Sequence, residues 1–244
     1  PNGAGKTTSF YSVMGLVKPD SGRIMLDGED ITRLPMYRRA ILGLGYLPQE
    51  TSIFRGMTVE QNISSVLEMS EPEPEARNAR LEKLLGEFGL LKLRSAPAMA
   101  LSGGERRRCE IARALAANPS IMLLDEPFGN LDNLTKAPLL RAIREATRDT
   151  RTAVVLATHD SREALALAHR VAVLQDGRLR QLGDRAQLVA QEPKGDHRHQ
   201  DRGEDHQHQK LMRVGGRHTA TTDLGLDVAV ARRDSQRHHP PVTR

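Results

Sequence analysis

The chain begins with PNGAGKTTSF (residues 1–10), a glycine-rich run that leads into a segment with helical periodicity. PNGAGKT matches all but the first residue of the pattern G-x-x-x-x-G-K-[ST], in which a loop between a buried strand and a helix holds a phosphate group. Gly3 and Gly5 let the backbone turn tightly, so that successive N–H groups point at one anion near the positive end of the following helix. The run therefore predicts a phosphate-binding loop; the alternative is a chance glycine-rich turn before a helix.

This loop supplies the candidate nucleotide-binding residues, which are Pro1, Asn2, Gly3, Ala4, Gly5, Lys6, Thr7 and Thr8. Lys6 is expected to reach the β and γ phosphates of a nucleotide, and the Thr7 hydroxyl is expected to coordinate Mg²⁺. ATP and Mg²⁺ are therefore the expected cofactors. Because the first glycine of the pattern and the strand that feeds it do not precede Pro1, we expect the chain to be truncated at its N-terminus and to lack the first strands of its sheet.

Strand and helix patterns alternate along the first three quarters of the chain. Short apolar runs bounded by turn residues predict strands at residues 23–27, 44–47, 121–125, 153–158 and 171–175. Helical periodicity predicts helices at residues 7–17, 102–117, 134–149 and 161–169. The alternation predicts an α/β fold with a mostly parallel sheet. Between about residues 50 and 118 the pattern becomes helical, broken by EPEPE at 71–75, which predicts a helical subdomain.

The last fifty residues differ in character from the rest. We expect one domain over residues 1–193 and a polar, histidine-rich tail over residues 194–244. GDHRHQDRGEDHQHQK (195–210) has no periodicity and carries four of the nine histidines. Clustered histidines can bind metal, but a segment without a core does not fix ligand geometry. We therefore predict a disordered tail and keep a metal site as the alternative.

The composition excludes several classes of function. The net charge of +5 invites a nucleic-acid interpretation, but only 3% of the residues are aromatic, too few for a base-stacking platform, and we expect no nucleic acid among the partners. The apolar runs fall short of the roughly 20 residues that span a bilayer, so any membrane role requires a partner. The single cysteine, Cys109, excludes an internal disulfide and suits the cytoplasm.

Two acids end the apolar strand IMLLD (121–125), which continues into Glu126 and Pro127. Burying a carboxylate is costly unless it is paired or bound to a metal, and a Mg²⁺–nucleotide complex supplies that compensation. By the logic of phosphate-loop proteins, Asp125 holds Mg²⁺ through water. Glu126 is then placed to polarise the attacking water as a general base. The alternative is that the two acids cap the next helix.

LSGGE (101–105) is a second candidate phosphate-binding surface, beginning at Leu101. Ser102 and Glu105 form the S-x-x-E capping box that predicts the start of a helix. The box does not require Gly103 and Gly104. Glycines at a helix start leave backbone N–H groups free to approach an anion.

Six motifs in register now point to one family. They are PNGAGKTT, Gln49 in YLPQE, LSGGERRR, LLDEP, Leu131 and Asp132 in GNLD, and His159 in ATHD. Their order and approximate spacing over residues 1–159 resemble the ATPase domain of ABC transporters. The resemblance implies an α/β P-loop NTPase core with a helical subdomain.

The resemblance also implies roles and partners. Two such domains form a head-to-tail homodimer with ATP between residues 1–8 of one copy and residues 101–105 of the other. Gln49 then senses Mg²⁺ and the transmembrane permease subunits, and counts as both a catalytic and a metal-site residue. Leu131 and Asp132 lie at the dimer contact, and His159 holds the γ-phosphate. The expected location is the cytoplasmic side of the bacterial inner membrane.

Within the family, the sequence up to Phe128 resembles the ATPases of lipopolysaccharide export, especially in SIFRGMTV (52–59). We expect apolar residues there to line the groove for a coupling helix of the membrane subunit; the alternative is core packing. After Phe128, GNLDNLTKAPLL and ATHDSREALALAH resemble the ATPases of solute importers instead. The sequence is thus either a divergent exporter ATPase or a hybrid of two halves.

Lipopolysaccharide export is the function we predict from the sequence. The alternatives are the ATPase of a solute importer and a hybrid or inactive fragment. Outside transport, a DNA-repair or translation ATPase of the same family is disfavoured because the interval from Lys6 to Ser102 leaves no room for a coiled coil or zinc module. A regulatory module without catalysis is disfavoured because Lys6, Glu126 and His159 are intact.

Overall fold

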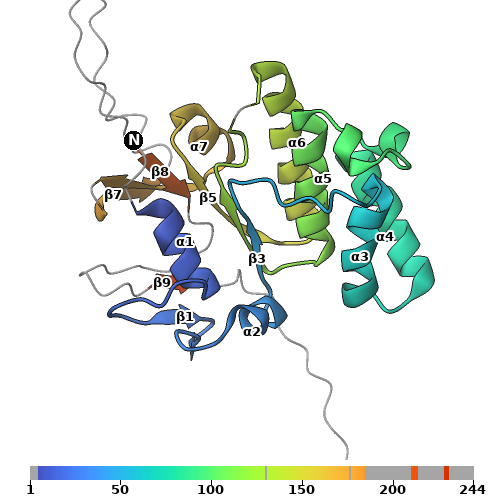
Figure 1. Cartoon of the computed structure of the whole chain (residues 1–244). Coiled ribbons are helices and arrows are strands. Elements are labelled where there is room, and N and C mark those ends of the chain that lie inside the picture. The colour runs from blue at the N-terminus through green and yellow to red at the C-terminus, as the bar shows by residue number, and fades with distance from the viewer. Residues whose placement is uncertain (1–4, 130, 176, 185–209, 214–227, 231–244) are drawn as a thin grey trace, which may run out of the picture.

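The computed structural model describes residues 5–129, 131–175, 177–184, 210–213 and 228–230. Its main sheet has six strands in the order β3-β4-β5-β8-β6-β7 (Figure 1). The bounds are Leu44–Leu47 for β3, Ile121–Asp125 for β4, Ala153–Thr158 for β5, Lys210–Arg213 for β8, Arg170–Gln175 for β6 and Arg178–Asp184 for β7. Strands β3, β4 and β5 are parallel, whereas β8 is antiparallel to both β5 and β6. The α/β fold is therefore as predicted, with the parallel part of the sheet at β3, β4 and β5; β7 also pairs antiparallel with β6.

A second, smaller sheet lies below the first in Figure 1. It has three strands in the order β2-β1-β9, with β1 at Ile24–Leu26, β2 at Glu29–Asp30 and β9 at Val228–Val230. Strands β1 and β2 form an antiparallel pair, and β9 runs parallel to β1.

The described helices cover both faces of the main sheet. They are α1 (Lys6–Met14), α2 (Met36–Ile41), α3 (Val59–Ser70), α4 (Pro74–Glu87), α5 (Gly103–Ala116), α6 (Asn133–Asp149) and α7 (Ser161–Leu167), with short 3-10 helices η1 (Leu91–Leu93) and η2 (Ala98–Ala100). Helix α1 lies on one side of the sheet, and α5 and α6 lie on the other (Figure 1). Coverage of both faces explains why the parallel strands read as continuous apolar runs.

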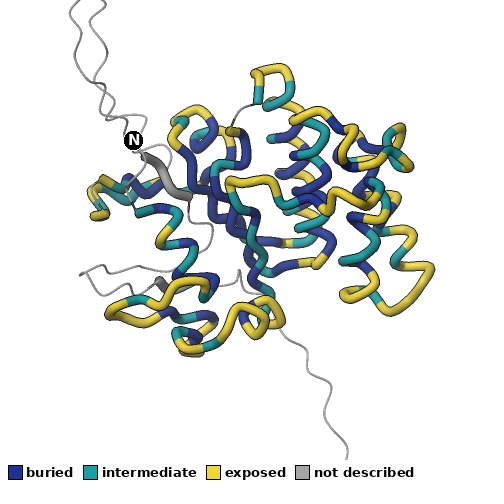
Figure 2. The backbone as a smooth tube through the Cα atoms, viewed as in Figure 1, coloured by how far each residue is buried: buried dark blue, intermediate teal, exposed yellow. Residues whose placement is uncertain are grey.

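Strand β4 separates two hydrophobic cores because successive side chains point to opposite faces. Ile121 and Leu123 join the core under α1, with Phe10 and Val155. Met122 and Leu124 join the larger core built from helices α3 to α6, together with Leu156 of β5. All five residues of β4 are buried, so both faces of this strand are dry (Figure 2). The strand that carries the predicted carboxylates is thus fixed from both sides.

Between β3 and β4 the chain forms helices α3, α4 and α5, as the change of pattern at residues 50–118 predicts. Val59, Ile63 and Leu67 of α3 are buried in the larger core, and α3 packs against α5. Helix α3 begins with a capping box: the Thr58 side chain accepts a hydrogen bond from the Gln61 amide, and the Gln61 side chain accepts one from the Thr58 amide.

Replacing the N-cap of α3, Thr58→Ala, should lower the free energy of unfolding by about 1 kcal/mol, because the first turn loses a partner for one of its free amides. Chemical denaturation measures the change. Ser64→Ala, in the interior of the same helix, is the matched control and should not destabilise, since alanine has the higher helix propensity. Equal stability of Thr58→Ala and the unsubstituted protein would contradict the assignment of the cap.

Two helices differ in length from the prediction. Helix α1 stops at Met14 rather than near residue 17, because Gly15 adopts φ 78° and its backbone caps the helix in a left-handed turn. A side chain at this position would also meet the Arg39 guanidinium at 3.0 Å. Helix α7 ends at Leu167. None of the helices in the described residues combines the length and the apolar character needed to cross a membrane.

The predicted disordered tail is not without structure throughout. Its residues 210–213 form β8 and its residues 228–230 form β9. The proposed boundary at residue 193 and all seven histidines after it lie outside the described residues, so the division into a domain and a tail, and the metal-site alternative, stay predictions.

Candidate active site

The start of α1 presents the end of the predicted phosphate loop. Gly5 is the N-cap residue with φ 79°, a left-handed conformation that glycine adopts without strain, and no side chain caps the helix. The first amides of α1 are therefore left for another acceptor, as a phosphate-binding helix start requires. Lys6 is buried, with 5% of its side chain exposed. Pro1, Asn2, Gly3 and Ala4 lie outside the described residues.

The carboxyl ends of the three parallel strands carry the other candidate residues. Gln49 follows β3, Asp125 ends β4 with Glu126 next, and His159 follows β5. Since β3, β4 and β5 are parallel neighbours, their ends meet at one edge of the sheet. Gln49 is exposed in its loop, and the His159 side chain is 55% exposed.

Lys6, Glu126 and His159 form a hydrogen-bonded cluster. The Lys6 ammonium donates to Oε1 of Glu126 at 2.5 Å, and His159 Nδ1 lies 2.6 Å from Oε2 of the same carboxylate. Burial acts to raise the pKa of Glu126, but the hydrogen bond and charge of Lys6, with the help of His159, outweigh it, so the pKa lies below its usual value. Glu126 is therefore ionised at neutral pH, as a general base must be.

Asp125 is the residue whose surroundings call for a cation. It is fully buried, and neither of its carboxylate oxygens has a hydrogen-bond partner among the described residues. Burial raises the pKa of Asp125, and the nearby Thr7 hydroxyl and Lys6 ammonium only partly oppose this. An unpartnered buried carboxylate beside a threonine hydroxyl is the oxygen-donor set that Mg²⁺ prefers. Asp125 and Thr7 thus fit the predicted metal site.

The LSGGE segment forms the predicted capping box at the start of α5. Ser102 N donates to Glu105 Oε2 at 2.8 Å, and Glu105 N donates to Ser102 Oγ at 3.3 Å. The Ser102 hydroxyl also donates to Glu105 Oε2 at 2.7 Å, and this hydrogen bond, together with that from the Ser102 amide, lowers the pKa of Glu105. A side chain at Gly103 would meet nothing within 4 Å, whereas one at Gly104 would lie 2.8 Å from the Thr135 side chain. Gly103 therefore leaves an open surface, and Gly104 allows α5 to pack closely on α6.

Asp132, placed by the family resemblance at a dimer contact, is the N-cap of α6 in this chain. Its carboxylate accepts hydrogen bonds from the amide and the hydroxyl of Thr135 at 2.8 and 2.9 Å. Leu131 beside it packs against the larger core. Within the described part of the chain, no hydrogen bond links Ser102, Glu105 or Asp132 to the cluster of Lys6, Glu126 and His159.

Sequence reasoning missed two sets of buried charges near the site. Arg107 and Glu110 of α5 form an ion pair of 3.1 Å. Lys136 of α6 donates to Glu163 of α7 at 2.7 Å, and Glu163 also accepts from Thr158, the residue before His159. The run ERRRCE does not by itself show which of its charges are buried. Helical spacing was the available signal, because residues 107 and 111 share one face and Ile111 is plainly apolar.

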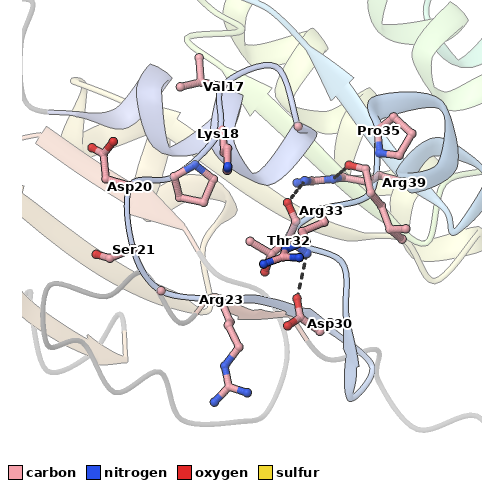
Figure 3. Close-up of a pocket in the computed structure, with 14 residues that line it drawn as sticks. Val17, Lys18, Asp20, Ser21, Arg23, Asp30, Thr32, Arg33, Pro35 and Arg39 are labelled. Atoms are coloured by element: carbon pink, nitrogen blue, oxygen red, sulfur yellow. Dashed lines mark hydrogen bonds between the residues drawn. The ribbon is translucent and has the colours of Figure 1, made fainter.

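A pocket in the N-terminal half of the chain is a separate feature. It has a volume of about 1110 Å³ and lies between the loop after α1, strand β2 and the start of α2 (Figure 3). Arg39 is buried at its edge and donates to the carbonyl oxygens of Ser12, Thr32 and Leu34. None of the candidate site residues that the structure describes lines this pocket.

Comparisons with known proteins bear on this geometry. A family model described as ABC transporter matches residues 1–129. A probable ABC transporter ATP-binding protein of Azorhizobium caulinodans is 53% identical over 191 residues, 78% of this chain and 67% of the relative. The lipopolysaccharide export system ATP-binding protein LptB of Acidithiobacillus ferridurans is 48% identical over 189 residues, 78% of each chain.

Solved structures agree with these sequence matches. The ATP-binding cassette MJ0796, solved as a dimer bound to ADP and Pi, has a TM-score of 0.65 at 27% identity and covers 75% of this chain and 82% of its own. The chain spans 67% of the A. caulinodans relative and 65% of an uncharacterized ABC transporter ATP-binding protein of Rhizobium meliloti, about two thirds of each.

The start of α1 lies beside two carboxylates at the end of β4 and a histidine after β5. Together with the fold and the sequence matches, this arrangement defines a class of nucleotide-hydrolysing proteins. The chain belongs to the family of ABC transporter ATP-binding proteins, and its enzyme class is that of the ATPases. The alignments of 189 and 191 residues are longer than the segment up to Phe128, so the similarity continues past the point where the resemblance changes.

Proposed function

We propose that the chain is the ATP-hydrolysing subunit of an ABC transporter that exports lipopolysaccharide. The single observation that carries hydrolysis is the Lys6–Glu126–His159 cluster beside the unpartnered Asp125. The cargo rests on the 45–48% identity to several LptB proteins. A solute importer stays the second candidate because the sequence after Phe128 resembles importer ATPases.

The residues would divide the reaction as follows. Lys6 and the first amides of α1 bind phosphate oxygens, and His159 contacts the γ-phosphate. Glu126 accepts the proton of the attacking water as the water oxygen bonds to the γ-phosphorus and the bond from that phosphorus to the β–γ bridging oxygen breaks, which releases ADP. Thr7, Asp125 and Gln49 would hold Mg²⁺, which would neutralise part of the phosphate charge. What supports this division is the placement of all these groups at one edge of the sheet.

Because burial raises the pKa of Asp125, Mg²⁺ binding should depend on pH. Only the ionised carboxylate binds the metal, so affinity should fall as the pH drops through the raised pKa, beginning above the ordinary aspartate value of about 3.9. Titration of Mg²⁺ with ATP present, followed by calorimetry at several pH values, measures this. Asp125→Asn should weaken the binding and remove the part of its pH dependence that comes from Asp125; Asp149→Asn, at the exposed end of α6, is the control. A pH-independent affinity in the unsubstituted protein would contradict the assignment.

A second copy of the chain and membrane permease subunits are the proposed partners. The exposed Gly103 surface and the exposed Asp132 are the parts of this chain that we assign to the contact with the second copy, with ATP held between residues 1–8 and residues 101–105. Assembly at the cytoplasmic face of the inner membrane follows from binding the permease. MJ0796, the solved relative, is itself dimeric.

The segment SIFRGMTV divides between core and surface. Ile53 and Val59 are buried in the larger core, so they are packing residues rather than groove residues. Phe54 and Met57 remain 47% and 38% exposed. The Arg113 guanidinium lies over the Phe54 ring at 4.3 Å and fixes its position. An exposed, held aromatic ring suits a hydrophobic contact with a coupling helix.

Copurification tests the cargo and this surface together. The protein should retain lipopolysaccharide-export membrane subunits in preference to an importer permease, and Phe54→Ala should weaken that retention by about tenfold, since aromatic anchors commonly contribute over 1 kcal/mol. Met69→Ala, which truncates an 88% exposed side chain on α3, is the control. Preferential retention of the importer permease would replace the first candidate with the second.

A further inference from the structure

Arg107 of α5 connects three separate segments of the chain. It is buried, with 8% of the residue exposed. Its guanidinium donates to the carbonyl oxygens of Pro127 at 2.9 Å, Asp125 at 3.3 Å and Pro48 at 2.9 Å. It also pairs with the Glu110 carboxylate at 3.1 Å. A planar guanidinium is the only side chain that can make this set of bonds at once.

The first two of these carbonyl groups belong to the residues on either side of Glu126. Glu126 itself has φ 44°, a left-handed conformation that a non-glycine residue keeps only where its surroundings hold it. Its amide donates to Ala157 of β5 at 2.9 Å, and its carbonyl accepts from Gly129 at 3.1 Å. Arg107 thus holds the carbonyl groups of the residues before and after Glu126, and so fixes the backbone from which the Glu126 side chain reaches Lys6 and His159.

The other hydrogen bonds of Arg107 and Glu110 hold the loop that carries Gln49. Arg107 binds the carbonyl of Pro48, just before Gln49. Glu110, only 2% exposed, accepts hydrogen bonds from the amides of Ser52 and Ile53 at 2.8 and 3.2 Å. Gln49 therefore lies between two points that one ion pair fixes.

We propose that Arg107 and Glu110 are positioning residues, which set the relative placement of Glu126 and Gln49 from a single point on α5. The inference rests on the proposed ATP hydrolysis. Neither residue touches the reacting atoms; they act through the backbone at residues 48–53 and 125–127. A buried ion pair is weak evidence for stability, since apolar residues of similar size often replace one without loss. Its retention here is explained by orientation of the two loops.

The double variant Arg107→Met/Glu110→Leu tests this. It removes both charges together, so no unpaired charge is left buried, and both new residues are good helix formers. We expect a melting temperature close to that of the unsubstituted protein, an unchanged affinity for ATP, and a kcat reduced on the order of 10²-fold, because a misplaced catalytic group lowers the rate without weakening binding elsewhere. A folded double variant with unchanged kcat overturns the proposal.

If the double variant does not fold, two single variants test the positioning role of Arg107 and Glu110. Arg107→Lys keeps the charge opposite Glu110 but lacks the planar fork, so kcat should fall while ATP affinity is retained. Glu110→Gln keeps an oxygen that can accept from Ser52 and Ile53, so it should restore most of the turnover that Glu110→Leu loses. Unchanged kcat in Arg107→Lys overturns the proposal.

Arg108→Met is the matched control. Arg108 is the next residue of α5 and also donates to backbone carbonyls, but to those of Phe88 and Gly89 in the helical region. Its kcat should equal that of the unsubstituted protein; a loss equal to that of Arg107→Lys would show that any disturbance of α5 suffices and overturns the proposal. Absence of Mg²⁺-dependent ATP turnover in the unsubstituted protein contradicts the proposed function instead, which keeps the two failures apart.

Discussion

Glu126→Gln should lower the rate of ATP turnover by about 10²- to 10⁴-fold, the usual contribution of a general base. The amide is nearly the same size as the carboxylate, so the left-handed backbone at this position and its hydrogen bonds with Ala157 of β5 and with Gly129 are preserved. What is lost is the ability to accept a proton from water. The variant should bind ATP at least as well as the unsubstituted protein, because Lys6 no longer faces a carboxylate.

Steady-state hydrolysis and equilibrium binding of ATP, measured on the same preparation, separate these two effects. Glu145→Gln, on the exposed face of α6, makes the same chemical change away from the site and should leave both quantities unaltered. Unchanged turnover in Glu126→Gln would show that another group accepts the proton, and the assignment of the base would then be wrong.

Lys6→Ala should weaken ATP binding by about 10- to 100-fold. Hydrogen bonds to charged groups contribute about 1.5–3 kcal/mol, and each 1.4 kcal/mol corresponds to a factor of ten. Lys6 is the cation that lies buried at the start of α1, so its loss removes positive charge from the place where the phosphates bind. The substitution also leaves Glu126 with His159 as its remaining partner in the cluster.

Because the loss of one partner of a buried pair can destabilise a protein, the fold of this variant needs its own measurement. A melting curve and far-ultraviolet circular dichroism provide it. Lys6→Met, which keeps an unbranched apolar stem, is a second variant for the case in which alanine is not tolerated. Lys92→Ala, an exposed lysine in η1, is the control. Normal ATP affinity in folded Lys6→Met would exclude the phosphate-binding role.

The strands of the core were predictable because their burial on both faces makes them continuous apolar runs. Residues 44–47, 121–125 and 153–158 form β3, β4 and β5 at the predicted bounds. Strand β7 was not predicted, since RLRQLGD is polar and only half-buried. Residues 210–213 were also missed, because a four-residue strand in a polar tail gives no pattern of its own and depends on pairing with β5 and β6.

For the site, motif spacing identified the groups that meet at the sheet edge, because each motif is local in sequence. Lys6, Glu126 and His159 come from three such motifs, and the parallel sheet brings them together. The capping box of Ser102 and Glu105 was predicted and is present. Arg107 was missed because its partners include main-chain carbonyl groups of distant segments. Every residue has such a group, so residue types do not identify these partners.

Lys6 and His159 both contact the Glu126 carboxylate, so this carboxylate lies where we propose that a phosphate group binds. The charges of Lys6 and Glu126 already offset each other before any nucleotide arrives, and the His159 ring contacts the same carboxylate. We expect an incoming phosphate to replace the Glu126 side chain at Lys6, which would free the carboxylate to accept a proton from water. In this proposal, binding of the nucleotide and release of the Glu126 carboxylate occur in the same step.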